Sequence, residues 1–177
     1  AGYTPLIVAS RYGHLELAQL VLERGADLSE ASKTGFTALH AACRNGRLEL
    51  AEYLLDCGAE RDLKDVDGAT ALHAACFGGH LGCMELLLKV WCAPKEEQTK
   101  EGSTPLLLVC YAGNRDGAEL LLAHGARFDV PHRETGLTPL HAAAYNGHQG
   151  VVELLLTWGA PPDLLAKNGR TALHAAA

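Results

Sequence analysis

The chain has 177 residues, of which 48% are hydrophobic and 20% charged, and its formal net charge at pH 7 is −6. No stretch approaches the roughly 20 consecutive apolar residues that a bilayer requires, and the first apolar residues belong to a repeat rather than to a secretion signal. The sequence has no basic block, and a net negative field repels a phosphate backbone, so we expect neither membrane insertion nor a nucleic-acid partner.

A Thr-x-Leu phrase occurs six times, each time after a glycine. The six glycines are spaced by 33, 33, 34, 34 and 33 residues, and a period of this length is typical of stacked repeats that bury their apolar faces against one another. We therefore expect a single repeat domain over residues 1–177, with five full repeats and a truncated sixth. The repeats begin near Gly2, Gly35, Gly68, Gly102, Gly136 and Gly169.

Each repeat is predicted to open with a short helix. A threonine stands two residues after every repeat glycine, and its hydroxyl can accept a hydrogen bond from the free amides of a first helical turn. Proline follows in Pro5, Pro105 and Pro139, where its missing N–H costs nothing. The helix should end at a second glycine eleven residues after the first, as at Gly13 and Gly46.

A second helix and an extended, hairpin-like finger complete each repeat. The second helix shows apolar residues at i, i+3 and i+4 and should end at Gly25, Gly58, Gly125 and Gly159. In the third repeat this position is Trp91. A bulky residue rarely adopts a positive φ, so we expect a different helix end there, through Cys92, Ala93 and Pro94.

Two departures from the period predict local weakness. The 34-residue spacings place one extra residue in the finger after the third repeat and one in the finger after the fourth. Gly117 stands where other repeats have leucine or valine, so we expect the fourth repeat to be the weakest internal link. The last residues, 170–177, should fray.

The helix, turn, helix and finger on this period, with phrases such as Thr138-Pro139-Leu140-His141 followed by Ala143, resemble the ankyrin repeat family. The resemblance covers the whole chain. It implies an all-α solenoid of stacked helix-turn-helix units with hairpin-like fingers, and a groove between the fingers and the first helices.

Residues that could carry chemistry are explained by their repeat positions. Cys43, Cys76 and Cys110 each lie eight residues after a repeat glycine, and stacked helices about 8–10 Å apart are too distant for disulfides in this column. His40 and His73 share a position that Ile7 and Leu107 fill elsewhere, so we interpret this histidine as a hydrogen-bonding residue and not as a zinc ligand. We expect no catalytic residues, no metal and no cofactor.

The aromatic residues are the exception, because seven of the ten fall at positions that point into the groove of ankyrin-like stacks. Buried aromatic and arginine anchors dominate binding energy in protein interfaces. The alternative is that these rings pack on one another between repeats. The predicted partner-binding residues are Tyr3, Arg11, Tyr12, Phe36, Arg44, Asn45, Asp67, Phe77, Tyr111, Leu137, Tyr145, Asn146 and Trp158.

These observations favour a non-enzymatic module that binds a protein or peptide partner. The alternative is a regulatory or targeting array of a larger enzyme, channel or adaptor protein. We expect a monomer that is part of a longer chain. The remaining cysteines, Cys57, Cys83 and Cys92, show no paired spacing, which indicates reduced thiols and a cytoplasmic location, with the nucleus also compatible.

Overall fold

The structure is a computed structural model that describes residues 2–175. These residues form helices joined by loops and contain no β-strand, so the predicted all-α class is confirmed. Two compact units, Ala1–Pro94 and Lys95–Ala177, divide the chain.

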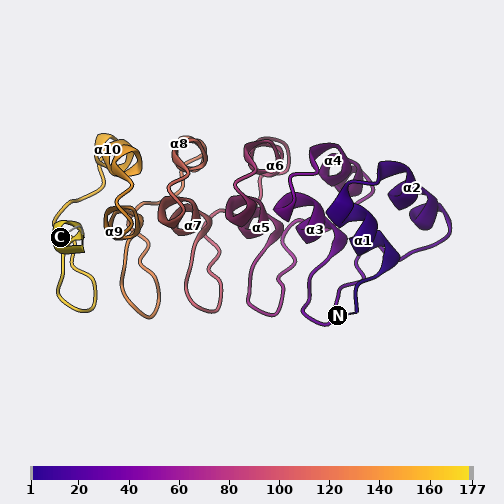
Figure 1. Cartoon of the computed structure of the whole chain (residues 1–177), viewed down its shortest axis with the longest axis horizontal. Helices are drawn as coiled ribbons and strands as arrows, with labels where there is room; N and C mark the ends of the chain where they lie inside the picture. The colour runs from indigo at the N-terminus through magenta and orange to yellow at the C-terminus, as the bar shows by residue number, and fades with distance from the viewer. Residues whose placement is uncertain (1, 176–177) are drawn as a thin grey trace. The chain divides into compact units, whose positions relative to one another are not determined.

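The first unit consists of three helix pairs. They are α1 (Pro5–Tyr12) with α2 (Leu15–Glu23), α3 (Ala38–Arg44) with α4 (Leu48–Asp56), and α5 (Ala71–Gly78) with α6 (Leu81–Glu85), which continues into a π-helical turn, η1 (Leu86–Val90). The first helices α1, α3 and α5 form one row that carries the fingers, and α2, α4 and α6 lie on the opposite side of that row (Figure 1).

The second unit repeats this arrangement. It contains α7 (Pro105–Tyr111), α8 (Arg115–Ala123), α9 (Pro139–Tyr145), α10 (Gln149–Thr157) and α11 (Ala172–Ala175). The first helix α9 packs against both α7 and α11. Of the segment predicted to fray, residues 176–177 lie outside the described part of the chain.

The predicted signals for helix starts and ends are confirmed. The hydroxyl of Thr4 accepts a hydrogen bond from the Ile7 N–H at 3.2 Å, and that of Thr104 accepts one from Leu107 at 3.1 Å. Gly13 ends the first helix of its repeat with φ of 78°, a left-handed conformation that a residue without Cβ adopts freely.

Stacking buries the same leucine position in successive repeats. Leu39 and Leu140, in the first helices α3 and α9, are 2% and 3% exposed. The equivalent Leu173, in α11, is 80% exposed, and α11 has no second helix among the described residues. Burial of this position therefore requires neighbouring helices that α11 lacks among the described residues. Each such leucine contributes about 1.5–3 kcal/mol when it is fully buried.

The repeated histidine links the first helix to the next finger. His40 Nδ1 accepts a hydrogen bond from the Thr37 N–H at 3.3 Å and lies 2.8 Å from its hydroxyl oxygen. The proton is therefore on Nε2, which donates to the Ala69 carbonyl at 3.0 Å. His141 Nε2 makes the same bond to the Arg170 carbonyl at 3.0 Å. The predicted structural role of this histidine is confirmed.

The extra residue of the third repeat lies in its second helix, so its predicted location in the finger is wrong. At the end of α2 the Ala26 N–H donates to Val21, five residues back, whereas the Ala93 N–H donates to Leu87, six residues back. The wide turn η1 accommodates the additional residue. The predicted change of helix end is confirmed, because Trp91 has φ of −104° and the positive φ, 48°, falls on Cys92.

The fourth repeat has its extra residue in the finger, as predicted. The Gly136 N–H donates to His132, four residues back, whereas the equivalent Gly35 N–H donates to Ser32, three residues back. The second helix of this repeat also has a cap that sequence analysis missed, since Asn114 Oδ1 accepts from the Gly117 N–H at 2.9 Å. Such a cap contributes about 1 kcal/mol and offsets the helix penalty of Gly117.

Candidate functional site

A hollow of about 350 Å³ opens in the first unit between its first helices and its fingers. Side chains from α1 and α3 form one wall, and side chains from the bases of two fingers form the other. Ten residues line the hollow: Tyr3, Ile7, Arg11, Thr34, Phe36, Ala41, Arg44, Asn45, Asp65 and Asp67.

Local hydrogen bonds fix the finger wall of this hollow. Asp65 Oδ1 accepts from the backbone N–H groups of Asp67 at 2.9 Å and Ala69 at 2.8 Å, as an aspartate does when it stabilises a tight turn. The Val66 N–H donates to the Thr34 carbonyl at 2.9 Å and joins the two fingers. The backbone that presents Thr34 and Asp67 is thus held in place.

Arginines line the helical wall. Arg11 and Arg44 occupy the same position, nine residues after their repeat glycines, in α1 and α3. The Arg44 guanidinium carbon lies 4.4 Å from the centre of the Phe77 ring, and that of Arg11 lies 5.8 Å from the Tyr12 ring. Stacking on an aromatic face orients a guanidinium and leaves its N–H edge available to an acceptor.

The structure brings six of the predicted partner-binding residues together in this hollow: Tyr3, Arg11, Phe36, Arg44, Asn45 and Asp67. The Asn45 side chain also donates to the Ala41 carbonyl at 2.8 Å, so it holds the end of α3. Sequence analysis missed Ile7, Thr34, Ala41 and Asp65. Ile7 could have been noticed in the sequence, because it replaces the histidine that most repeats have at this position. The small Ala41 has no such distinguishing feature.

Two further predicted residues of the first unit lie beside the hollow and not in its lining. Phe77 is 64% exposed and supports Arg44. Tyr12 is 56% exposed and its ring centre lies 6.1 Å from that of His14. No two of the predicted aromatic rings stack on each other within the first unit's described residues, so ring-to-ring packing does not explain their positions there.

In the second unit, Tyr111 and Tyr145 end the first helices α7 and α9 and are 59% and 69% exposed. The half-buried Leu137 precedes α9, and the Asn146 side chain donates to the Ala142 carbonyl at 2.9 Å. Trp158 follows α10, a second helix. It therefore belongs to a different row from the two tyrosines.

The second unit also has an apolar hollow of about 400 Å³. It lies between α9, α10 and α11 and is lined by Leu140, Val152, Leu156 and Leu173, among other residues. Leu156 is 44% exposed, whereas the equivalent Leu55 of α4 is 1% exposed. This hollow has almost no polar lining, so it offers contact area but few hydrogen bonds.

Burial changes the pKa values of two thiols and of one repeated histidine. The hydrogen bond with Cys83, together with burial, raises the pKa of Cys43, and burial raises the pKa of Cys110 far above its ordinary value. Both thiols are therefore protonated at pH 7, although a thiolate is the nucleophilic form. Burial lowers the pKa of His40. Among residues 2–175, no group of three or more His, Cys, Asp or Glu side chains could hold a metal ion.

Comparison with known families agrees with this arrangement. A model of ankyrin repeats in three copies matches residues 1–65, 57–132 and 128–177, which together span the chain. The chain belongs to the ankyrin repeat family. Ankyrin repeats generally serve as protein–protein interaction modules, and the family is typically non-enzymatic.

No curated protein matches this ankyrin chain significantly. Within the part of the chain that the structure describes, none of the helices is long and apolar enough to span a bilayer.

Proposed function

We propose that this ankyrin domain is a non-enzymatic recognition module that holds a protein or peptide partner against its first helices and fingers. The observation that carries the proposal is the hollow of the first unit, where six residues selected from sequence converge on one concave surface. Interfaces concentrate their binding energy in aromatic and arginine side chains, and this surface presents both.

The exposed rings support the same surface in each unit. Phe77, Tyr111 and Tyr145 all stand nine residues after a repeat glycine, at the end of a first helix. Each is more than half exposed, which leaves large apolar faces available at a position that the fold does not need to bury. Loss of these rings should weaken partner binding more than it weakens folding.

The test is affinity capture with the triple variant Phe77→Ala, Tyr111→Ala and Tyr145→Ala. We expect it to lose the partners that the wild-type chain captures while its far-ultraviolet circular dichroism is unchanged. A matched control replaces three apolar residues of second helices, Leu20, Leu48 and Leu81, which are 45%, 43% and 38% exposed. Equal capture by the wild type and the aromatic triple variant would refute the proposed surface.

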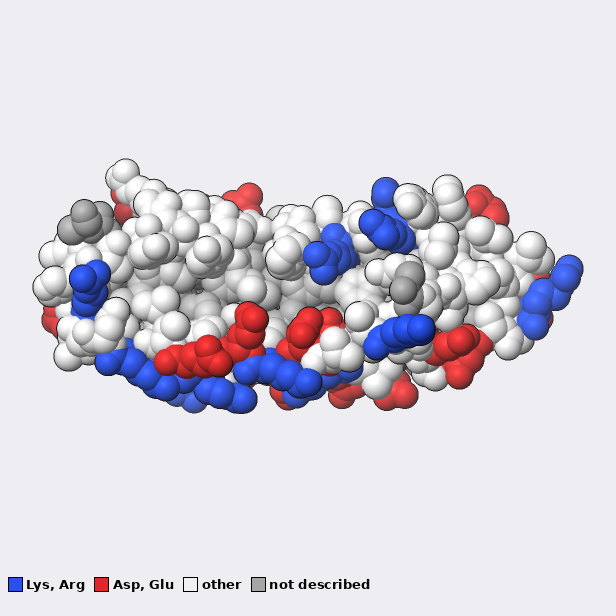
Figure 2. All heavy atoms as spheres, turned by 60° about the horizontal axis from the view of Figure 1, so that its bottom comes forward, with Lys and Arg blue, Asp and Glu red and all other residues white. Residues whose placement is uncertain are grey.

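The charge of the finger surface bears on the kind of partner that this domain binds. Both acidic and basic side chains are visible on the finger side of each unit (Figure 2). A mixed surface with a net charge of −6 favours a protein or peptide over a nucleic acid. The six free cysteines, four of them buried, support an intracellular location. We propose that the module is monomeric.

The second candidate function is a regulatory or targeting array that docks within a larger enzyme, channel or adaptor. The apolar hollow between α9, α10 and α11 favours it, because an apolar segment of the same polypeptide could fill this hollow. Replacement of Leu156 and Leu173 by glutamate would abolish such docking, whereas capture through the first unit would survive.

A further inference from the structure

The hollow of the first unit carries opposite charges on its two walls. Arg11 and Arg44 project from the helices, and Asp65 and Asp67 stand on the finger. The ion pairs Lys89–Glu85, Arg115–Glu119 and Arg127–Asp129 lie elsewhere, and no ion pair found within residues 2–175 involves Arg11 or Arg44. Neither arginine is neutralised by the protein itself.

Both guanidinium groups are free to bind an acceptor. No hydrogen bond within the described residues uses the side chain of Arg11 or Arg44, and both side chains are exposed. The ring of Phe77 supports Arg44 from one side, so less side-chain freedom is lost when this guanidinium forms a bond. A carboxylate is the acceptor that matches its planar fork.

The carboxylates of the finger wall differ in availability. Asp65 Oδ1 already accepts two backbone N–H groups, whereas Asp67 is exposed and no hydrogen bond uses its side chain within the described residues. Asp67 therefore disfavours an anion on the finger side and confines an acidic group to the helical wall. A phosphate with two charges would face both aspartates, so this surface suits a single carboxylate better.

Between the charged walls lie apolar groups. The ring of Tyr3 is 49% exposed, and Phe36 is half-buried with its ring centre 5.2 Å from His40. Ile7, which is 2% exposed, lies beneath the lining at the position where α3 has His40, so the floor of the hollow is aliphatic at this point. An apolar side chain of about leucine size would replace water there.

We infer that the hollow of the first unit binds an extended peptide in which an acidic side chain stands next to an apolar one. The carboxylate binds Arg11 and Arg44, and the apolar side chain packs against Tyr3, Ile7 and Phe36. This inference rests on the proposed function and narrows its partner. The charge preference is confined to the first unit, since the position of the two arginines holds Phe77, Tyr111 and Tyr145 in later repeats.

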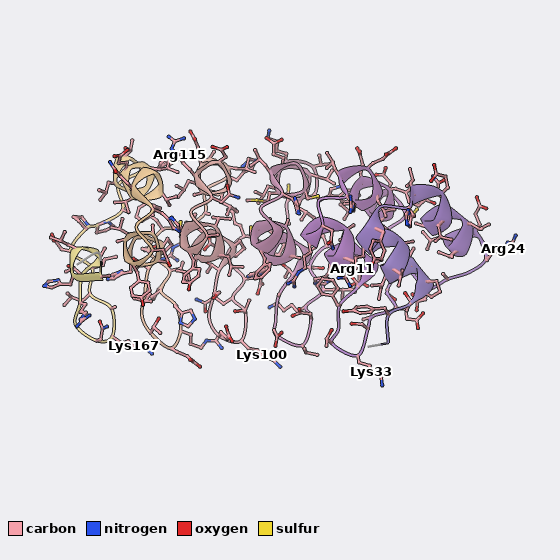
Figure 3. The ribbon with its side chains drawn as sticks, in the orientation of Figure 1. Arg11, Arg24, Lys33, Lys100, Arg115 and Lys167 are labelled. Atoms are coloured by element: carbon pink, nitrogen blue, oxygen red, sulfur yellow. The ribbon has the colours of Figure 1, made fainter. Side chains whose placement is uncertain are left out.

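The experiment is selection from a random-peptide display library on the intact chain. We expect the selected peptides to be enriched in aspartate or glutamate beside an aliphatic or aromatic residue. The double variant Arg11→Gln and Arg44→Gln should lose this enrichment. The matched control is Arg24→Gln with Lys33→Gln, because both side chains point away from the space beside Arg11 (Figure 3).

A synthetic peptide with the selected consensus then gives the magnitude by fluorescence anisotropy. Each arginine substitution should weaken binding about tenfold, which corresponds to roughly 1.4 kcal/mol, and Asp67→Asn should strengthen it. Replacing the acidic residue of the peptide by its amide must reproduce the loss with the wild-type protein, so the result does not depend on how any variant folds. Binding should also weaken as salt is added.

The outcomes separate the two proposals. Selection of neutral or basic peptides would overturn the acidic preference but not the proposal that the groove binds a peptide. Acidic peptides that bind the double arginine variant as tightly as the wild type would have the same consequence. Failure to select any peptide above an empty-matrix control would count against both.

Discussion

Replacing Cys92 with glycine should stabilise the protein. Cys92 is exposed and has φ of 48°, the only positive φ at a non-glycine among the described residues. At the equivalent helix ends the residue is glycine, for example Gly25 with φ of 84° and Gly58 with φ of 96°. A left-handed conformation costs a residue with a Cβ about 1–2 kcal/mol, whereas glycine loses roughly 0.5–1 kcal/mol more backbone freedom on folding. The net gain should be about 0.5–1 kcal/mol.

The measurement is thermal unfolding followed by far-ultraviolet circular dichroism. For a chain of this size, 1 kcal/mol shifts the midpoint by about 2–4 °C, so we expect the Cys92→Gly midpoint to rise by about 1–4 °C. Cys92→Ala removes the thiol but keeps the strained backbone, and it should leave the midpoint unchanged.

A second exposed cysteine provides the opposite control. Cys57 ends α4 with φ of −74°, which an L-residue adopts without strain. Cys57→Gly should therefore lower the midpoint. If Cys92→Gly fails to raise the midpoint, or if both glycine variants shift it in the same direction, the assignment of strain to Cys92 is wrong.

Other positions give predictions of defined sign. Gly78→Ala should destabilise the protein by about 1–3 kcal/mol, because the new Cβ would overlap the Arg44 carbonyl oxygen. Gly150→Ala should be neutral or stabilise it by up to about 1 kcal/mol, since the new Cβ would meet only a side-chain carbon, at 3.5 Å. Denaturant midpoints that rank the two variants the other way would contradict this. Ser10→Ala should stabilise by about 1 kcal/mol in urea unfolding, because the Ser10 hydroxyl is fully buried without a hydrogen-bond partner; a loss of stability would show that the hydroxyl is satisfied. Burial lowers the pKa of His40 below its ordinary 6.5, so the unfolded chain binds the proton more readily, and stability should fall as the pH drops below about 6.5 until the folded pKa is reached. His40→Leu should flatten the pH profile of unfolding, and an unchanged profile would contradict the assignment.

The helical architecture could be predicted because each of its signals is local. Threonine before a first turn and glycine at a left-handed helix end act through bonds within a few residues. The structure confirms both, at Thr4 and Gly13 for example. Repetition removes the usual ambiguity, since the same signal occurs at each period.

The location of an extra residue could not be predicted from spacing alone. Two 34-residue spacings look alike in sequence, yet one residue widens the helix end before Ala93 and the other lengthens the finger before Gly136. The two cases differ in which backbone hydrogen bond spans the extra residue, the one at the end of the second helix or the one in the finger. Trp91 in place of glycine was the one local sign of the first case.

The candidate site could be predicted only in part. Large residues such as Arg44 and Phe36 stood out because they occupy repeat positions that other residues fill elsewhere. Asp65 did not, since its turn-forming role and its place in the hollow follow from how two fingers come together. The shape of a cavity depends on how separate elements pack together, and the sequence of a single repeat does not determine this packing.

The wide turn at Leu86–Val90 has a consequence for how such proteins change in length. A one-residue insertion in an ordinary α-helix would rotate everything beyond it by about 100°. Here one hydrogen-bonded turn, closed by the Ala93 N–H and the Leu87 carbonyl, contains one more residue than its equivalents. Ala93 and the finger after it therefore keep the repeat positions that they have in the shorter repeats. Natural variation in helix length can therefore accumulate without scrambling the columns of side chains on which recognition depends.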